Sequence, residues 1–141
     1  MDALPSTMPG RWTYRSYRNT FDLVNGEAEK ALRLIFGEGT FLLEESAGGG
    51  LQGTLDMGGG YVLDLSGTVS TDETAAFSLV GLGRPGSATA GWQYDYRGQR
   101  APTWPNGVDQ VPALLGSVIR AKPHDGAPAG VTASFIAVRQ P

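Results

Sequence analysis

Aromatic residues with a polar tip recur at alternate positions in two segments of the chain. Trp92, Tyr94 and Tyr96 are spaced by two, and Trp12 and Tyr14 repeat that spacing near the N-terminus. Because alternate residues of a β-strand point to one side, each set shares a face. A buried phenol or indole usually has a hydrogen-bond partner, so these residues favour a ligand cavity over a plugged interior, which is the alternative. The residues expected to bind the ligand are Trp12, Tyr14, Ser16, Tyr61, Trp92, Tyr94, Tyr96 and Trp104.

The same residues offer groups for proton transfer. In an enzyme without a cofactor, the Tyr94 hydroxyl would polarise a carbonyl, and Asp109, or Asp95 if that strand faces the other way, would move the proton. Arg18 shares the inward register of Trp12 near a strand end, where it would hold a carboxylate or an enolate. A cyclase, isomerase or lyase is therefore the alternative to a binding module, with Tyr94, Asp109 and Arg18 as its catalytic residues.

No metal and no cofactor are expected. The sequence has no cysteine and one histidine, which excludes cysteine-based zinc sites and argues against other metal cages. A proline and a glycine flank His124 and Asp125, which predicts an exposed turn; a triad with Ser117 is the alternative. Gly81–Gly86 matches the GxGxxG pattern but leads into another strand, so it predicts a turn and no dinucleotide site.

The charge balance narrows the partners. Eleven basic and fourteen acidic residues give a net charge of −3, which lacks the basic footprint of a nucleic-acid-binding protein. No run approaches the roughly 18 apolar residues of a membrane-spanning helix. The N-terminus has neither the basic nor the hydrophobic region of a signal peptide. We therefore expect a cytoplasmic protein whose partner is a small molecule, and neither nucleic acid nor a membrane.

Period-two runs bounded by glycine-rich turns predict an all-β protein. Because short connections join the runs, we expect one antiparallel up-and-down barrel over residues 10–141, after a tail of residues 1–9. At most one short helix is expected, over Asn25–Leu32, and a two-sheet sandwich is the alternative. The eight expected strands are Arg11–Arg18, Ala31–Glu45, Leu51–Met57, Tyr61–Ser70, Ala75–Gly83, Thr89–Arg100, Leu114–Lys122 and Val131–Arg139.

A long loop, Ala101–Ala113, interrupts this regular succession of strands. It contains three prolines and Trp104. Loops of this length inside compact domains are often functional lids, and proline limits the entropy lost when a lid closes. We expect the loop to cover one mouth of the barrel.

Alternation also assigns the faces of the remaining strands. It places Leu115, Ser117 and Ile119 of the seventh strand inside, and Arg97 and Arg120 outside. The other residues expected inside are Leu55, Met57, Tyr61, Leu63, Leu65, Phe77 and Leu79.

The last strand is apolar on both faces. A strand facing solvent alternates more cleanly, so the outer side chains Ile136 and Val138 predict contact with another subunit. We expect a homo-oligomer that forms through strands seven and eight.

Gly10-Arg11-Trp12 opens the first strand, Leu51–Leu55 reads LQGTL in an early hairpin, and Gly91-Trp92 comes later. These three short motifs resemble the calycins, the barrel group that includes avidins, lipocalins and several cofactor-free enzymes. The opening Gly-x-Trp is shared by avidins and lipocalins, whereas the lipocalin cysteines are absent. The resemblance implies an eight-stranded barrel that binds a small molecule.

Overall fold

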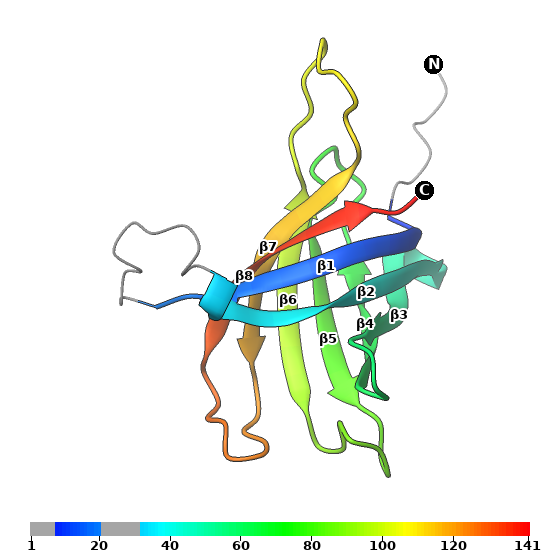
Figure 1. Cartoon of the computed structure of the whole chain (residues 1–141). Coiled ribbons are helices and arrows are strands. Elements are labelled where there is room, and N and C mark those ends of the chain that lie inside the picture. Colours follow the sequence, from blue (N-terminus) through cyan, green and yellow to red (C-terminus); the bar gives the residue numbers. More distant parts are fainter. Residues whose placement is uncertain (1–7, 21–31) are drawn as a thin grey trace.

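The computed structural model describes residues 8–20 and 32–141, and its architecture is all-β. Its antiparallel strands are hydrogen-bonded in chain order, and β8 pairs with β1 to close a barrel (Figure 1). The up-and-down barrel expected from the sequence is confirmed. The strands are β1 (Gly10–Arg18), β2 (Ile35–Ser46), β3 (Gly50–Asp56), β4 (Val62–Val69), β5 (Phe77–Gly83), β6 (Gln93–Arg100), β7 (Ala113–Arg120) and β8 (Thr132–Arg139).

Helical structure among the described residues consists of two short 3-10 turns, η1 (Leu32–Leu34) and η2 (Ala47–Gly49). The helical turn expected over Asn25–Leu32 lies outside the described residues, except for Leu32, which begins η1. No helix in the described part of the chain is long and apolar enough to cross a membrane.

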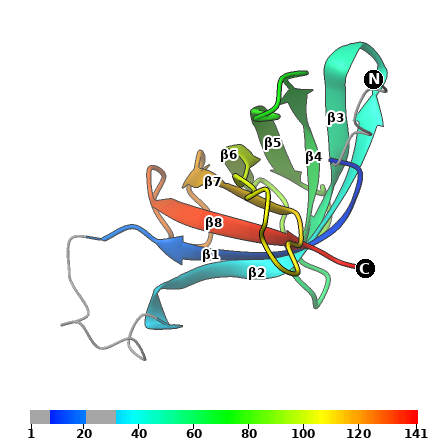
Figure 2. The ribbon, with the colours of Figure 1, turned by 90° about the horizontal axis from the view of Figure 1, so that it is seen from above.

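The barrel has two ends with different connections. The β2–β3, β4–β5 and β6–β7 connections lie at one end of the barrel, which we call the upper end because the β6–β7 loop is drawn at the top of Figure 1. The connections after β3, β5 and β7 lie at the opposite, lower end. Figure 2 looks from above and shows the β6–β7 loop on the near side of the barrel. Because each strand crosses the barrel once, segments just before and just after a strand lie at opposite ends.

Aromatic rings fill the middle of the barrel. The ring centroid of Tyr14 lies 4.7 Å from that of Phe41 and 5.5 Å from that of Phe135, and Tyr96 lies 5.8 Å from Phe41. These separations are typical of packed aromatic pairs. Desolvation raises the pKa of Tyr14 to about 12, and it raises the pKa of Tyr96 well above its ordinary value. The middle is thus a packed core of protonated phenols, and any ligand site lies nearer to an end.

Two glycines make room for these rings. A Cβ on Gly116 would lie 2.6 Å from the ring of Phe135, and a Cβ on Gly98 would lie 2.7 Å from the ring of Phe77. The two glycines are directly paired across β6 and β7. A side chain at either position would displace a ring from a close-packed interior.

The facing of β7 is the reverse of the sequence prediction. Leu114 and Val118 are buried, whereas Leu115 and Ile119 are each 38% exposed. The prediction followed the larger apolar side chains, but the inner row of this strand includes a glycine that leaves space for an aromatic ring. A shift of one residue moves every side chain to the other face, so Arg120 lies on the inner row and not outside as predicted. The residues predicted inside but found outside are Leu115, Ser117 and Ile119.

Facing is predicted correctly for most other strands. The residues confirmed on the inner face are Trp12, Tyr14, Ser16, Leu55, Leu63, Leu65, Phe77, Leu79, Tyr94 and Tyr96. Met57 packs against the core while only partly buried, and Tyr61 is 44% exposed. Met8, within the predicted tail, is also buried.

Candidate functional site at the lower end of the barrel

Two adjacent strands and one loop bring a set of polar and aromatic side chains together at the lower end. Trp92 immediately precedes β6, and Tyr94 is on the inner row of that strand. Arg120 ends β7 and is directly paired with Tyr94 in the sheet. The β7–β8 connection then carries His124 and Asp125 back against these residues, as their hydrogen bonds show.

A chain of hydrogen bonds joins four of these side chains. Arg120 Nε donates to Tyr94 Oη over 3.0 Å, Tyr94 Oη lies 2.5 Å from His124 Nε2, and His124 Nδ1 lies 2.9 Å from Asp125 Oδ2. Because a carboxylate only accepts, we assign the proton of the neutral imidazole to Nδ1, and Nε2 then accepts from the Tyr94 hydroxyl. All donors point the same way along the chain, so each bond polarises the next.

Trp92 forms an aromatic wall beside this chain. Its ring stacks on His124 with centroids 3.9 Å apart and an interplanar angle of 18°, and its Nε1 donates to Asp125 Oδ2 over 3.1 Å. Tyr61 also contacts Trp92, with ring centroids 5.8 Å apart. The stacking leaves the His124 side chain only 12% exposed.

Aromatic rings and hydrogen bonds also fix the guanidinium of Arg120. Its Cζ lies 5.1 Å from the centroid of Phe36 and 5.7 Å from that of Tyr94. Its Nη1 donates to the carbonyl of Pro128 over 3.1 Å. Contact with aromatic faces favours a cation, and the planar group has little freedom left to lose when it binds something.

Local turn chemistry sets the position of His124. The backbone of His124 and Ala127 exchanges two hydrogen bonds of 3.1 and 2.7 Å. Between them, Asp125 has φ 48° and Gly126 has φ 78°. An Asp-Gly pair is a preferred sequence for a tight turn in which both central residues have positive φ.

The residues predicted to bind a ligand are not gathered in one place. Trp92 and Tyr94 lie at the lower end, with Tyr61 beside Trp92. Trp12 lies toward the upper end and donates its indole N–H to the Met8 carbonyl over 3.0 Å. The predicted residues that are buried on the inner face are Trp12, Tyr14, Ser16, Tyr94 and Tyr96.

The predicted lid lies at the other end. Trp104 and Asp109 are exposed parts of the β6–β7 loop, and Trp104 is 74% exposed. Gln110 binds both the backbone N–H and the carbonyl of Trp104, which closes the loop on itself. Because β6 crosses the barrel between Tyr94 and this loop, the loop does not cover the lower mouth. Arg18, the last residue of β1, is exposed.

Three site residues escaped the sequence analysis. The prediction of an exposed His124 is wrong, and its Nε2 meets Tyr94 rather than Ser117, which lies on the outer face of β7. Arg120 was hidden by the reversed facing of β7. One signal was available in the sequence. Because β7 pairs with β6 antiparallel, the turn that follows β7 has to lie near the start of β6, where Tyr94 is. Phe36 carried no signal beyond its aromatic type.

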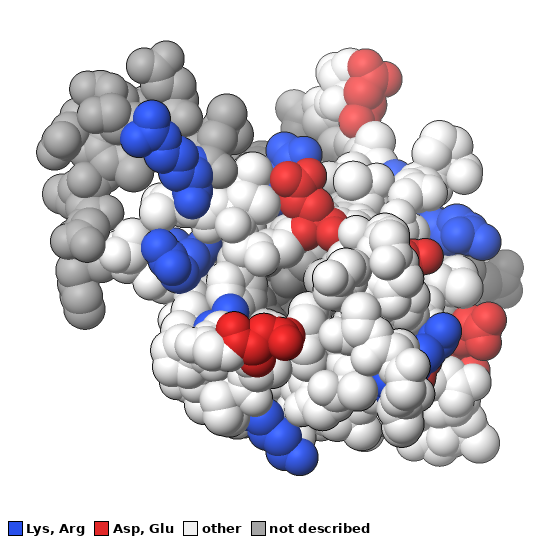
Figure 3. Space-filling model, turned by 60° about the horizontal axis from the view of Figure 1, so that its bottom comes forward, with Lys and Arg blue, Asp and Glu red and all other residues white. Residues whose placement is uncertain are grey.

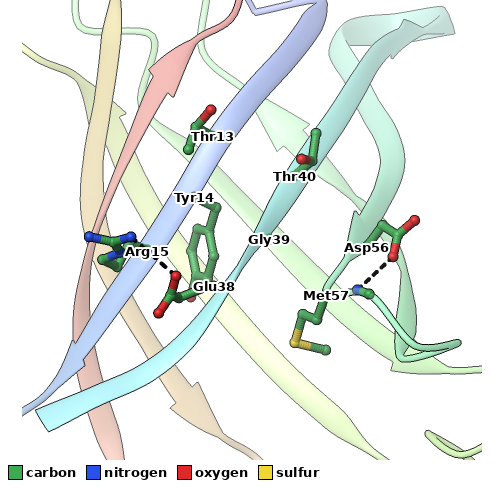
Figure 4. Close-up of a pocket in the computed structure, with 9 residues that line it drawn as sticks. Thr13, Tyr14, Arg15, Glu38, Gly39, Thr40, Asp56 and Met57 are labelled. Atoms are coloured by element: carbon green, nitrogen blue, oxygen red, sulfur yellow. Dashed lines mark hydrogen bonds and ion pairs between the residues drawn. The ribbon is translucent and has the colours of Figure 1, made fainter. Parts of the chain in front are cut away.

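The barrel also has a groove on its outer surface (Figure 4). It opens over Gly39 and has a volume of about 490 Å³. Its charged groups already have partners, because Arg15 pairs with Glu38 and Asp56 accepts from the backbone N–H of Gly58. No group directed at a ligand converges there, so the lower end is the stronger candidate. The groove is lined by Thr13, Tyr14, Arg15, Glu38, Gly39, Thr40, Asp56, Met57 and Gly58.

The lower end shows no single-sign charge patch. Figure 3 turns this end toward the viewer, and the basic and acidic side chains of the described residues are interspersed among uncharged ones. Within residues 8–20 and 32–141, no three histidine, aspartate or glutamate side chains are placed to hold a metal ion. The groups that converge at the mouth are the rings of Trp92 and Phe36, the phenol of Tyr94, the imidazole of His124 and the guanidinium of Arg120.

Comparisons of the chain with family models, with curated proteins and with solved structures gave no match.

Proposed function

We propose that the protein binds a small, largely apolar or aromatic molecule at the lower mouth of the barrel. The observation that carries this proposal is the convergence of Trp92, Tyr94, Arg120 and His124 at one end of a barrel whose middle is packed. Small-molecule sites combine aromatic walls with a few polar groups that fix orientation. Trp92 and Phe36 both keep part of their surface exposed, as a ligand at the mouth requires.

We place the chain with the calycin-like barrels as part of the same proposal. Supporting this are the closed barrel of eight strands and the opening Gly10-Arg11-Trp12, which begins β1. The Trp12 ring is fully buried, and Arg139 Cζ lies 5.5 Å from its centroid. Barrels of this strand number commonly hold one small ligand.

Tryptophan fluorescence tests the binding proposal. A screen of small aromatic and polyketide-like compounds should quench the protein, because a ligand at the lower mouth contacts Trp92. Trp92→Phe should remove the ligand-dependent change, whereas Trp104→Phe, at the upper end, should keep it. A response that Trp104→Phe abolishes and Trp92→Phe retains would overturn the assignment of the site.

A second candidate function, catalysis without a cofactor, is favoured by the hydrogen-bond chain. Tyr94 Oη would take a proton from a carbon next to a substrate carbonyl while its own proton passes to His124 Nε2. Asp125 would stabilise the resulting imidazolium, and the electron pair of the broken C–H bond would form an enolate held by Arg120. His124 and Asp125 thus replace Asp109, which lies at the other end of the barrel.

Exchange of a carbon-bound hydrogen of the ligand for deuterium distinguishes catalysis from binding alone. An isomerase of this kind should exchange one carbon-bound hydrogen of a bound carbonyl compound with deuterated water, which mass spectrometry detects. His124→Asn should slow this exchange by about a hundredfold or more, because general base catalysis is worth that much. A ligand recovered without deuterium supports the binding module alone.

We further propose that the chain forms a homo-oligomer through the outer faces of β7 and β8. Leu115 and Ile136 are directly paired there, and Ile119 and Val138 extend the row. These four side chains are between 37% and 41% exposed. Small uncharged residues separate them, so the centre of the face carries no charge, as the core of an interface requires. On the neighbouring strands, Arg15 is directly paired with Ile136 and Arg97 with Ser117, and these charges would lie at the rim.

The size of this face fits a dimer of the same chain. Together with their neighbours β6 and β1, strands β7 and β8 span about 26 by 19 Å, on the order of 500 Å² before the surface of protruding side chains is added. A standard interface covers roughly 800 Å² on each partner, so protruding side chains and the neighbouring loops would supply the remainder. A two-fold axis near the Leu115–Ile136 pair would make the face complementary to itself.

Light scattering tests the oligomer. At high micromolar concentration the mass should be at least twice the 14.8 kDa of one chain. Ile136→Lys should dissociate the assembly with an unchanged β circular dichroism signal, whereas Val80→Lys, on the outer face of β5, should not. A wild-type protein that stays at one chain mass would overturn the proposal.

A further inference from the structure

Arg120 brings a positive charge to the lower mouth without a counter-ion among the described residues. Among the described residues, Arg15 pairs with Glu38 and Arg84 pairs with Asp64, whereas no carboxylate pairs with Arg120. Arginine stays protonated in proteins, so its charge is permanent. A partly buried charge is costly to leave without a partner of opposite sign.

The carboxylate of Asp125 does not neutralise the charge of Arg120. Asp125 accepts from His124 Nδ1 and from Trp92 Nε1, and its side chain is 71% exposed. It therefore belongs to the far end of the hydrogen-bond chain, two side chains away from Arg120.

The guanidinium has donors left over. Tyr94 Oη takes the Nε proton and the Pro128 carbonyl takes one Nη1 proton. Of the five N–H groups of an arginine, these two bonds occupy two, and Nη2 has no partner among the described residues. Because the rings of Phe36 and Tyr94 hold the guanidinium plane, its free edge is already oriented.

We infer that the ligand is an aromatic carboxylic acid whose carboxylate binds the free edge of Arg120. Two parallel N–H···O bonds between a guanidinium and a carboxylate are among the strongest and most directional pairs in proteins. The aromatic body lies against Trp92 and Phe36. This inference rests on the proposed binding function and names the ligand class of that same site.

A second inward arginine supplies an internal comparison. Arg100 lies on the inner row of β6 at the upper end, and its Nε is buried without a hydrogen-bond partner. No aromatic ring among the described residues holds its guanidinium by a cation–π contact, and no phenol or imidazole is bonded to it. Arg139, also toward the upper end, lies over the ring of the fully buried Trp12. Arg120 combines two ring contacts with hydrogen bonds to a phenol and a carbonyl, so it is the better preorganised for a ligand.

A matched pair of probes tests the inference. Naphthoate and naphthamide have the same ring system and nearly the same size, and only naphthoate carries a charge at neutral pH. Calorimetric titration of the full chain should show naphthoate binding at least about tenfold more tightly. Arg120→Gln should abolish the preference, and Arg120→Lys should retain part of it. Arg97→Gln, on the outer face of β6, and Arg100→Gln, at the upper end, should leave it unchanged.

The outcomes separate this inference from the function on which it rests. Equal affinity for both probes, or a preference that survives in Arg120→Gln, would overturn the carboxylate assignment and leave aromatic binding intact. A preference lost in Arg100→Gln instead would move the anion to the upper end and overturn it as well. Binding of neither probe would contradict the proposed function together with the inference. Circular dichroism of each variant confirms that the barrel has folded.

Discussion

The two ends of the barrel close in different ways, and their tryptophans show the contrast. Trp12, toward the upper end, is fully buried, and its indole N–H is bonded to a backbone carbonyl of its own segment. Trp92, at the lower end, is half-buried, and it stacks on His124 and donates to Asp125. One tryptophan is held by packing and the other by functional groups of a loop.

The inward arginines repeat the contrast. Arg120 at the lower end contacts a phenol, a carbonyl and two rings, whereas the buried Nε of Arg100 at the upper end bonds to nothing in the described part of the chain. Residue type alone therefore does not mark the site. The surroundings of the same residue type distinguish the end that we propose as the ligand site from the end that is closed by packing.

The largest expected effect separates the two tryptophans. Trp12→Ala should lower the free energy of unfolding by about 3–5 kcal/mol, the range for truncating a buried aromatic residue. Trp92→Ala should cost clearly less, because its ring keeps contact with solvent. Urea unfolding measures both. Equal losses would show that the lower end stabilises the fold as much as the upper end does.

The buried Tyr14 should make the stability of the protein fall at alkaline pH. Burial raises the pKa of Tyr14 from 10.0 to about 12, so above pH 10 the unfolded chain releases this proton while the folded chain keeps it. Stability from this group is complete below pH 10 and falls by about 2–3 kcal/mol as the pH rises to 12.

Two variants isolate that contribution. Tyr14→Phe should reduce the alkaline decline in urea unfolding, with the contribution of the buried Tyr96 remaining. Tyr61→Phe, at the lower end and 44% exposed, should leave the decline in place. If the stability of both variants falls with pH as it does in the wild type, desolvation of Tyr14 does not cause the loss of stability at alkaline pH.

Methionine in place of Arg100 and methionine in place of Arg120 should affect stability differently. Arg100→Met removes a buried nitrogen that lacks a partner, so we expect stability to hold or to rise by up to about 1 kcal/mol. Arg120→Met should cost about 1–2 kcal/mol, because Tyr94 and the Pro128 carbonyl lose a charged donor. Thermal unfolding compares the two. A loss in Arg100→Met equal to that in Arg120→Met would contradict the contrast between the ends.

The fold followed from patterns that are local in the sequence. Alternation in Gly10–Arg18 and in Gln93–Arg100 places large residues on one side, and glycine-rich turns separate the strands. Short connections then leave few topologies, and closure removes the exposed edges. These signals need no knowledge of distant contacts.

The site did not follow from local patterns, because its members meet through pairing between strands. The larger side chains Leu115 and Ile119 lie outside, while Gly116 on the inner row makes way for the ring of Phe135. Hydrophobicity therefore pointed to the wrong face of β7. Once that facing is reversed, Arg120 comes beside Tyr94, and the turn after β7 brings His124 to the same phenol.

The smallest expected effect concerns two aspartates with positive φ, one at each end. Asp125 at the lower end has φ 48°, and Asp109 at the upper end has φ 53°. Asparagine tolerates this backbone conformation, and its amide oxygen still accepts hydrogen bonds, so Asp109→Asn should change stability by less than about 0.5 kcal/mol.

Asp125→Asn should also stay within about 0.5–1 kcal/mol, because the Asp125 side chain is 71% exposed and the asparagine amide can still accept a hydrogen bond. Its amide oxygen can still accept from Trp92 Nε1, so the stacking of Trp92 on His124 should persist. Thermal unfolding of both variants, with calorimetric titration of naphthoate, checks the pair. An affinity loss in Asp125→Asn beyond about tenfold, with Asp109→Asn unchanged, would mean that the carboxylate itself orders the mouth. In that case the charge on Asp125, and not only the rings of Trp92 and His124, would distinguish the lower end from the upper.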